Sequence, residues 1–275
     1  MKVGIIGSPI SHSLSQLLHG FWLKKFDIDG VYLPIAIEPN DFETKIRSLS
    51  QDGFAGFNVT VPHKETAYKL VDTLTETARE IGAVNTIICN ENGRFAGDNT
   101  DAFGFISNIK TTVPSWKPDL SSAVVLGAGG AARAVFSALR AEGVAEIRIC
   151  NRTRERAEEL AAHFGNLNVV DWDKRNDACE GVGLLVNTTT LGMVGKPPLE
   201  INIDQLRDDA VVNDIVYAPL ETDLLKSAKT NGYQPVDGLG MLLHQARPGF
   251  EAWFGQRPEV TDELREHVLA GLGHS

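Results

Sequence analysis

Short apolar runs alternate with helical patterns along the first hundred residues of the chain. The apolar runs predict strands over residues 2–6, 31–37, 54–61 and 85–89. The periodic segments between them predict helices over residues 16–26, 41–50, 63–70 and 77–81. This alternation is typical of a sheet built from β-α units and covered by helices.

The same rhythm restarts after residues 114–118, whose two prolines suit a connection between elements. Aliphatic runs predict strands over residues 123–126, 147–150, 168–170, 184–187, 211–216 and 233–236. These runs are continuous rather than alternating, which favours a parallel sheet covered on both faces. Two further helices are predicted over residues 239–253 and 259–272, with no strand between them. We expect these last helices to return and pack on the first domain.

Composition narrows the class of protein. The chain has 275 residues, enough for two domains that each bury a core. Apolar residues make up 43%, yet no apolar run approaches the roughly 20 residues that span a membrane. The formal net charge of −10 argues against a broad electropositive face for nucleic acid. We therefore expect no nucleic-acid or membrane partner. Separately, we expect a small-molecule substrate and a monomer or homodimer.

The cysteines and the N-terminus indicate the compartment. Cys89, Cys150 and Cys179 lie far apart without CxxC spacing, which favours reduced thiols over a disulfide framework or a zinc site. No metal is expected. Residues 1–7 predict a strand and a turn rather than a secretory signal peptide. The protein is therefore expected in the cytoplasm.

A glycine-rich turn joins the strand at residues 123–126 to a helix predicted over residues 131–142. Its spacing is GxGxxA, in which Gly127 makes the tight turn and Gly129 lets the backbone approach a pyrophosphate. The pyrophosphate charge would sit at the helix N-terminus. A purely structural turn is the alternative, but the strand-turn-helix context favours a dinucleotide. The residues expected at this site are Gly127, Ala128, Gly129, Gly130 and Ala131.

The next strand indicates which dinucleotide is bound. An NAD site places Asp or Glu at the end of that strand, on the ribose hydroxyls. Here the strand ends in Asn151, Arg152 and Thr153. A carboxylate would repel a 2′-phosphate, whereas Arg152 can bind it with a charge-assisted pair and Thr153 can donate a hydroxyl hydrogen bond. The cofactor is therefore predicted to be NADP (NADPH). Arg152 is the arginine expected to bind the phosphate, because Arg154 can be explained as a solvated helix residue.

These patterns predict an α/β fold with two domains. Residues 1–103 plus 239–275 would form an N-terminal α/β domain, and residues 104–238 a Rossmann-type NADP-binding domain. The C-terminal helices belong to the first of these because they follow the completed second sheet.

Residues 58–64 (NVTVPHK) carry the chemistry of the first domain. An apolar strand leads through Pro62, whose fixed φ suits a helix start, directly to Lys64. A helix N-terminus disfavours a positive charge, and a nearby carboxylate would favour it, so a lysine held between them can exchange protons. Residues 83–86 and 97–101 add amides, hydroxyls and carboxylates that could hold a small polyol. A solvated surface lysine is the alternative.

A serine-rich segment precedes the first helix. Ser13 and Ser15 can present hydroxyls to a carboxylate beside the helix N-terminus. Ser15 is equally well explained as an ordinary N-cap. Spacing alone leaves both interpretations open.

In these motifs and their order the chain resembles the shikimate dehydrogenase family nearly from end to end. The resemblance rests on residues 11–15, 58–64, 82–86, 97–101, 127–132, 151–153, 214–217 and 238–245. It implies a substrate-binding domain and an NADP-binding domain with the active site in the cleft. It also implies reversible hydride transfer between NADPH and 3-dehydroshikimate, in the biosynthesis of chorismate and the aromatic amino acids.

The resemblance further implies individual roles. Lys64 and Asp101 correspond to the catalytic pair, and Gly238 and Met241 to residues near the nicotinamide. Substrate contacts are implied for Ser13, Ser15 and Tyr217 on the carboxylate, and for Thr60, Asn85 and Gln245 on the ring hydroxyls. Two positions depart from the family pattern, Gln16 in place of the usual proline and Thr190 in place of the common serine. Neither removes a catalytic group, so affinity rather than activity is expected to change.

Two alternatives remain at this stage. One is a quinate/shikimate dehydrogenase of broader substrate range that uses NAD or NADP. Arg152 argues against the use of NAD. The other is a non-catalytic NADP-binding sensor of the same fold, against which the presence of both Lys64 and Asp101 argues.

Overall fold

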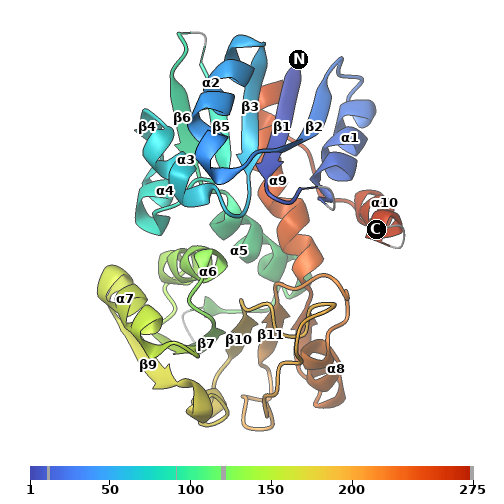
Figure 1. Ribbon diagram of the computed structural model, residues 1–275. Coiled ribbons are helices and arrows are strands. Elements are labelled where there is room, and N and C mark those ends of the chain that lie inside the picture. Colours follow the sequence, from blue (N-terminus) through green and yellow to red (C-terminus); the bar gives the residue numbers. More distant parts are fainter. Residues whose placement is uncertain (11–12, 91, 119–121, 273–275) are drawn as a thin grey trace. The chain divides into compact units, whose positions relative to one another are not determined.

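The structure is a computed structural model that describes residues 1–10, 13–90, 92–118 and 122–272. The chain forms two compact units, unit 1 (Met1–Asp101 and Leu242–Ser275) and unit 2 (Ala102–Met241). It passes between them at helix α5 (Asp101–Thr112) and within helix α9 (Gly238–Phe254). Each unit has its own sheet with helices around it (Figure 1). The predicted two-domain α/β fold is confirmed.

Unit 1 contains a mixed sheet of six strands in the order β2-β1-β3-β5-β6-β4. The strands are β1 (Lys2–Gly7), β2 (Val31–Ala36), β3 (Phe54–Val59), β4 (Thr73–Leu74), β5 (Thr86–Cys89) and β6 (Phe95–Asp98). Strand β1 is parallel to β2 and β3, whereas β5 is antiparallel to both β3 and β6. The strand-helix alternation did not predict β4 or β6. Consecutive strands β5 and β6 pair directly, without a helix between them.

Helices cover both faces of this sheet. Those of unit 1 are α1 (Ser15–Lys25), α2 (Phe42–Gln51), α3 (Lys64–Leu70), α4 (Glu76–Ile81), most of α9, and α10 (Asp262–Leu272). Helices α2 and α3 lie in front of the strands in Figure 1, and α9 lies behind them. The Trp253 indole N–H donates to the Ile87 carbonyl at 3.1 Å, which fixes α9 against β5. The C-terminal helices therefore do return to the first sheet.

Helix α10 begins three residues later than predicted. The Thr261 hydroxyl accepts a hydrogen bond from the Leu264 backbone N–H at 3.3 Å, so this threonine caps the first turn. The predicted helix began too early because the apolar periodicity of residues 259–272 continues on the N-terminal side of that cap.

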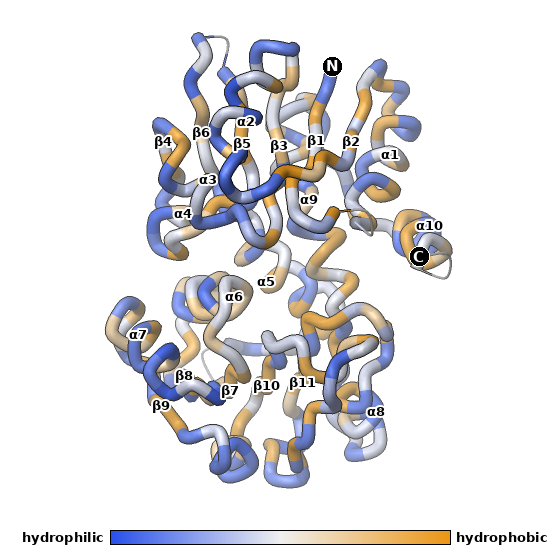
Figure 2. The backbone as a smooth tube through the Cα atoms, viewed as in Figure 1, coloured by the Kyte–Doolittle hydropathy of each residue, from blue (hydrophilic) through white to orange (hydrophobic). Residues whose placement is uncertain are grey.

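Unit 2 is a parallel sheet in the order β12-β11-β10-β7-β8-β9. The strands are β7 (Ser122–Leu126), β8 (Glu146–Asn151), β9 (Leu167–Asp171), β10 (Leu184–Asn187), β11 (Val211–Asp214) and β12 (Gln234–Val236). Numbered from β7, this is the 3-2-1-4-5-6 order of the Rossmann fold. The hydrophobic stretch of β10 is orange in Figure 2 and fully buried, as expected for a central parallel strand.

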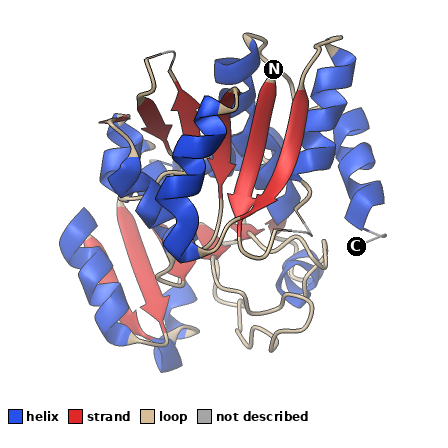
Figure 3. Ribbon diagram, turned by 45° about the horizontal axis from the view of Figure 1, so that its top comes forward, coloured by secondary structure: helices blue, strands red, loops and turns tan. Residues whose placement is uncertain are grey.

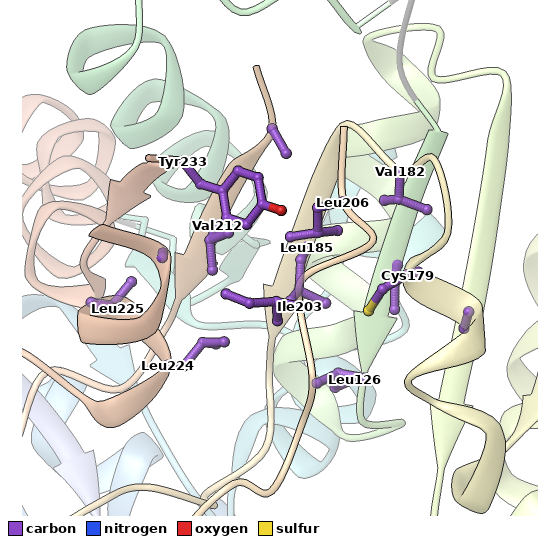
Figure 4. Close-up of a cluster of buried hydrophobic side chains, with 14 of the residues drawn as sticks. Leu126, Cys179, Val182, Leu185, Ile203, Leu206, Val212, Leu224, Leu225 and Tyr233 are labelled. Carbon is purple, nitrogen blue, oxygen red and sulfur yellow. The ribbon is translucent and has the colours of Figure 1, made fainter. Parts of the chain in front are cut away.

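Helices α6 (Gly130–Ala141), α7 (Arg154–Phe164) and α8 (Asp223–Thr230) follow three of the strands of unit 2. Figure 3 shows helices in blue around the red strands of each sheet. One buried cluster lies beside β10 and β11 and includes Leu185, Val212, Leu225 and Tyr233 (Figure 4). Helices α5 and α8 were not predicted.

Strand β11 ends at Asp214, two residues before the predicted end. The Asp214 carboxylate accepts a hydrogen bond from the Val216 backbone N–H at 3.0 Å. This local turn takes the backbone out of the sheet although Ile215 and Val216 are apolar.

Two buried histidines make unit 1 sensitive to acid. Burial lowers the pKa of His19 from 6.5 to about 3, an effect that the Asn58 side chain opposes. Burial and then the Arg247 charge lower the pKa of His244 from 6.5 to about 4. The folded state therefore prefers the neutral rings. Their contribution to stability is complete above pH 6.5 and is lost as the pH falls towards 4 to 3.

Replacement of His19 should reduce this acid sensitivity. His19 lies in an aromatic environment and stacks on Tyr32 with ring centroids 4.0 Å apart, so His19→Phe is a compatible substitution. Between pH 7 and 5.5 the variant is expected to lose about 1 kcal/mol less unfolding free energy than the wild type, by linkage. Urea unfolding at both pH values measures this difference. His267→Phe, at an exposed position on α10, is the matched control. If His19→Phe and the wild type lost equal unfolding free energy, the acid sensitivity could not be attributed to His19.

Candidate functional site

Lys64 is the first residue of α3 and its backbone is fixed from two sides. The preceding residue, His63, is buried, donates from Nε2 to the Ile37 carbonyl at 2.7 Å and stacks on the Phe42 ring. The Lys64 carbonyl accepts a hydrogen bond from the Val84 backbone N–H at 2.9 Å. The start of α3 is thereby held between β2, α2 and the segment that precedes β5.

The Lys64 side chain forms an ion pair with Asp101, the first residue of α5. The side chains are 24% and 11% exposed, so the pair is largely shielded yet still accessible. The Asn99 side-chain oxygen accepts from the Asp101 backbone N–H at 3.1 Å and fixes the entry to the helix. A shielded, hydrogen-bonded lysine-carboxylate pair can hold and transfer a proton.

Asn85 is the centre of a polar network around this pair. Its side-chain amide donates to the second Asp101 oxygen at 2.8 Å and to the Thr100 hydroxyl at 3.0 Å. The Asn85 side-chain oxygen accepts from the Thr100 backbone N–H at 2.9 Å. Gln245, on α9, offers its Oε1 to the Asn85 amide at 3.4 Å. The structure thus brings together Lys64, Asp101, Asn85 and Gln245, which lie far apart in the sequence.

A second branch of the network leads to Ser15. The buried Tyr32 hydroxyl donates to the Asn58 side-chain oxygen at 2.7 Å, and the Asn58 amide donates to the Asn85 carbonyl at 3.2 Å. Burial raises the pKa of Tyr32 well above its usual range, opposed by a hydrogen bond with the Ser15 side chain. Hydrogen bonds therefore connect Tyr32 through Asn58 to the Asn85 backbone, and the Ser15 side chain lies close to the Tyr32 hydroxyl.

The structure answers the N-cap question for Ser15. Leu14 occupies the N-cap position of α1 without a side-chain hydrogen bond, and Ser15 is the first helical residue. The Ser13 hydroxyl accepts from the Ser15 backbone N–H at 3.3 Å. The N-cap interpretation of Ser15 is therefore wrong. Residues 11 and 12 of the serine-rich motif lie outside the described residues.

Thr60, the other predicted substrate contact near this site, directly follows β3 and is half-buried.

In unit 2 the glycine turn fits a dinucleotide. Gly127 has a φ of +110°, and a Cβ there would lie 2.6 Å from the Thr188 hydroxyl, so both conformation and packing require glycine. Apart from its chain neighbours and the backbone of its own helix, a Cβ at Gly129 or Gly130 would meet no atom of the described residues within 4 Å. Those two glycines therefore leave the backbone at the start of α6 open to a ligand. Ala128 and Ala131 are half-buried beside them.

Arg152 follows β8 and is exposed. It has no ion-pair or hydrogen-bond partner among the described residues. Arg154, two residues later, pairs with both Glu158 and Asp171. The Asn151 side chain donates to the Thr153 carbonyl at 2.7 Å and shapes the turn between them. Of the two arginines, Arg152 is the one whose guanidinium is available to an anion.

The remaining predicted residues of unit 2 are Tyr217, which follows β11, and Gly238 and Met241 on α9. A Cβ at Gly238 would overlap the Ile215 carbonyl, so close packing of backbone on backbone requires this glycine. Tyr217 is half-buried, and burial raises the pKa of its hydroxyl. Met241 is half-buried on α9. The roles of Tyr217, Gly238 and Met241 in binding stay predictions.

Comparison with known proteins identifies the family. Three family models match the chain: the shikimate dehydrogenase substrate binding domain at residues 5–87, shikimate / quinate 5-dehydrogenase at residues 112–191, and the shikimate 5'-dehydrogenase C-terminal domain at residues 238–269. The chain is 57% identical over 268 residues to shikimate dehydrogenase (NADP(+)) of Paramagnetospirillum magneticum, covering 97% of each chain. The chain belongs to the shikimate dehydrogenase family.

Solved structures of family members have the same fold. Shikimate 5-dehydrogenase from Thermus thermophilus in complex with NADP(H) and shikimate is 34% identical, with a TM-score of 0.87 over 98% of this chain and 99% of that one. Quinate dehydrogenase from Corynebacterium glutamicum in complex with NAD is 31% identical, with a TM-score of 0.91 and the same coverage. The names of these two proteins correspond to the two activities that the sequence left open. One is a shikimate dehydrogenase with NADP(H) and shikimate bound, and the other is a quinate dehydrogenase with NAD bound.

Several polar residues of the network were not assigned a role from the sequence, among them Tyr32, Asn58 and Thr100. Asn58 and Thr100 stand inside the motifs that carried the resemblance, and their position beside Thr60 and Asp101 was the available signal. Tyr32 had no such signal, because an aromatic residue in a strand is usually part of the core.

None of the described helices combines the length and hydrophobicity that a membrane span needs. The described residues contain no cluster of His, Cys, Asp and Glu suited to a metal ion.

Proposed function

We propose that the protein catalyses the reversible NADPH-dependent reduction of 3-dehydroshikimate to shikimate, a step of chorismate and aromatic amino-acid biosynthesis. The observation that carries the proposal is the Lys64–Asp101 pair, which Asn85 holds beside Gln245. A polyol with a carboxylate needs amide and hydroxyl partners around a proton donor, and this network supplies both. Relatives that cover nearly the whole chain bear the same name at 50–57% identity.

The residues of unit 1 divide the chemistry between them. NADPH, when bound, supplies the hydride. As negative charge develops on the substrate oxygen, Lys64 Nζ delivers a proton to it. Asp101 accepts the hydrogen bond of Lys64 and stabilises its charged form, and Asn85 fixes the orientation of the Asp101 carboxylate. Lys64 and Asp101 are joined by their ion pair, so in the oxidative direction the pair takes the proton back from the substrate hydroxyl.

We also propose which residues of unit 2 hold the cofactor. The N-terminus of α6 and the backbone of Gly129 would bind the pyrophosphate, because the helix dipole and free N–H groups favour an anion there. Arg152 would bind the 2′-phosphate, with Asn151 and Thr153 shaping the turn. The absence of a carboxylate between residues 151 and 154 favours NADP over NAD.

One spectrophotometric assay tests this proposal. Oxidation of shikimate and of quinate is followed at the absorbance of the reduced nicotinamide, with NADP and with NAD in parallel. We expect efficient turnover only with shikimate and NADP. Comparable kcat/KM for quinate and NAD would instead assign the activity of the quinate dehydrogenase relative. NADP binding without turnover of either substrate would indicate a sensor.

Replacing Ser15 with alanine should weaken substrate binding. A hydroxyl that donates to the substrate carboxylate contributes about 1.5 kcal/mol, so KM for shikimate should rise roughly tenfold while kcat changes little. KM and the melting temperature are measured on the same preparation. Ser50→Ala is the control, because the Ser50 hydroxyl bonds a helix carbonyl of unit 1. A lower melting temperature with unchanged KM would show that Ser15 serves only its bond with Tyr32.

We further propose that the enzyme acts in the cytoplasm as a monomer or a homodimer. The three cysteines are free, which suits a reducing compartment. Light scattering coupled to gel filtration would distinguish the two oligomeric states, and a larger assembly would contradict both.

A further inference from the structure

Asp214 is a buried carboxylate at the carboxyl end of β11 that the proposed chemistry does not use. It is 1% exposed, and no Lys or Arg of the described chain pairs with it. Three donors surround it instead. The Asn187 amide and the Val216 backbone N–H donate to one oxygen, both at 3.0 Å, and the Thr222 hydroxyl donates to the other at 2.7 Å.

The Asn187 contact connects Asp214 to the glycine turn. Asn187 ends β10, and its side-chain oxygen accepts from the Thr189 backbone N–H at 3.0 Å and from the Thr189 hydroxyl at 2.7 Å. The Thr188 hydroxyl donates to the Leu126 carbonyl at 2.7 Å. Residues 188–191 therefore form a fixed loop in which Thr188 and Thr189 lie directly against Gly127.

The Val216 contact connects Asp214 to a second part of the same edge of the sheet. It turns the chain after β11, so that the Ile215 carbonyl lies against Gly238 at the start of α9. The Ile215 backbone N–H also donates to the Asn187 carbonyl at 3.1 Å. One carboxylate thus holds together the segments that follow β10 and β11. Ligands of Rossmann folds bind at this carboxyl edge.

We propose that Asp214 is a positioning residue for the dinucleotide. It sets the loop of residues 188–191 against the glycine turn and fixes the segment that packs on Gly238. The inference rests on the proposed NADP-binding function of unit 2 and extends it to a residue that does not touch the cofactor.

A carboxylate is suited to this position because three hydrogen-bond donors converge on it. An ionised carboxylate only accepts hydrogen bonds, and its two oxygens can satisfy all three donors. Burial raises the pKa of Asp214 from 3.8 to about 6, and the bonds from Thr222, Val216 and Asn187 oppose the shift. Burying an ionisable group without a cation costs folding free energy. Such local costs are typical of functional sites rather than of plain cores.

The test variant is Asp214→Asn, which keeps the shape of the side chain. An amide replaces one acceptor oxygen with a donor group, so either Thr222 or the Asn187–Val216 side loses its partner. The dissociation constant of NADPH, measured by fluorescence titration, is expected to rise about tenfold, the worth of one lost hydrogen bond. KM for NADP should rise in parallel, with a smaller change in kcat.

The split between KM and kcat separates positioning from simple stability. Loss of folded protein lowers the apparent kcat but leaves KM and the dissociation constant unchanged. Ile203→Ala, in the buried core of unit 2, is the matched control and should show that pattern with a lower melting temperature. Thr189→Val tests the same loop at a half-buried position and should weaken NADPH binding severalfold even if Asp214→Asn does not fold.

Wild-type affinity for NADPH in folded Asp214→Asn or in Thr189→Val would overturn the inference. A wild-type protein that does not bind NADPH would overturn the proposed cofactor itself, and with it the positioning role. Weaker NADPH binding in every one of these two variants that folds, beside unchanged binding in Ile203→Ala, supports it.

Discussion

Replacing Lys64 with alanine is expected to lower kcat by about 10²- to 10⁴-fold, the usual contribution of a positioned acid-base group. The side chain is paired with Asp101 and largely shielded at the start of α3, where it can deliver a proton to a substrate oxygen. KM for shikimate should change much less than kcat, because the substrate contacts proposed for Asn85, Gln245 and Ser15 remain. Initial rates over a range of shikimate concentrations at saturating NADP measure both quantities.

The control for this variant is Lys69→Ala, an exposed lysine on the same helix. It should retain wild-type kcat and KM, because only its surface charge is lost. Circular dichroism and the melting temperature establish that both variants are folded. Turnover near the wild-type rate in Lys64→Ala would remove this lysine from the mechanism.

Asp101→Asn extends the same prediction to the pair. If Lys64 and Asp101 act as one unit, the double variant should lose little more activity than Lys64→Ala alone. Multiplication of the two single losses would show instead that the residues act independently.

Much of the fold could be predicted from the sequence because the hydrophobic patterns of its helices and strands are strong. The continuous aliphatic runs of unit 2 indicated the parallel sheet, and the glycine turn marked its first strand-helix junction. Helix α5 was missed because Gly104 lies within it and its apolar residues include Phe105 and Ile109, which only tertiary packing buries. Strand β6 was missed because it has four residues, one of them Gly97, and pairs antiparallel with β5.

The site could be predicted only in its parts. The sequence placed Lys64 at a helix start and singled out Asp101 and Asn85 as polar groups nearby. It did not establish that Asn85 bonds the Asp101 carboxylate, because that contact depends on the pairing of β3 with β5 and on the start of α5. The Tyr32–Asn58 bond is a contact between two strands that do not neighbour each other in the sheet, so no local pattern indicates it.

Removal of the Arg152 guanidinium is expected to change the choice of cofactor. Arg152 follows β8, and its guanidinium is exposed with no described partner, whereas Arg154 is engaged by Glu158 and Asp171. Loss of a charge-assisted pair with the 2′-phosphate should cost NADP binding about 1.5–3 kcal/mol, or roughly 10- to 150-fold. NAD lacks that phosphate and should be nearly unaffected, so the preference for NADP should fall by the same factor.

The measurement is kcat/KM for NADP and for NAD in Arg152→Ala, with Arg154→Ala as the matched control. Arg154→Ala should leave the ratio of the two values unchanged, since its guanidinium is already neutralised by two carboxylates. An equal fall for both cofactors in Arg152→Ala would mean that the arginine supports the turn after β8 and does not bind the phosphate. A fall confined to NADP would assign the 2′-phosphate contact to Arg152, because removing one positive charge can discriminate between the cofactors only where they differ in charge.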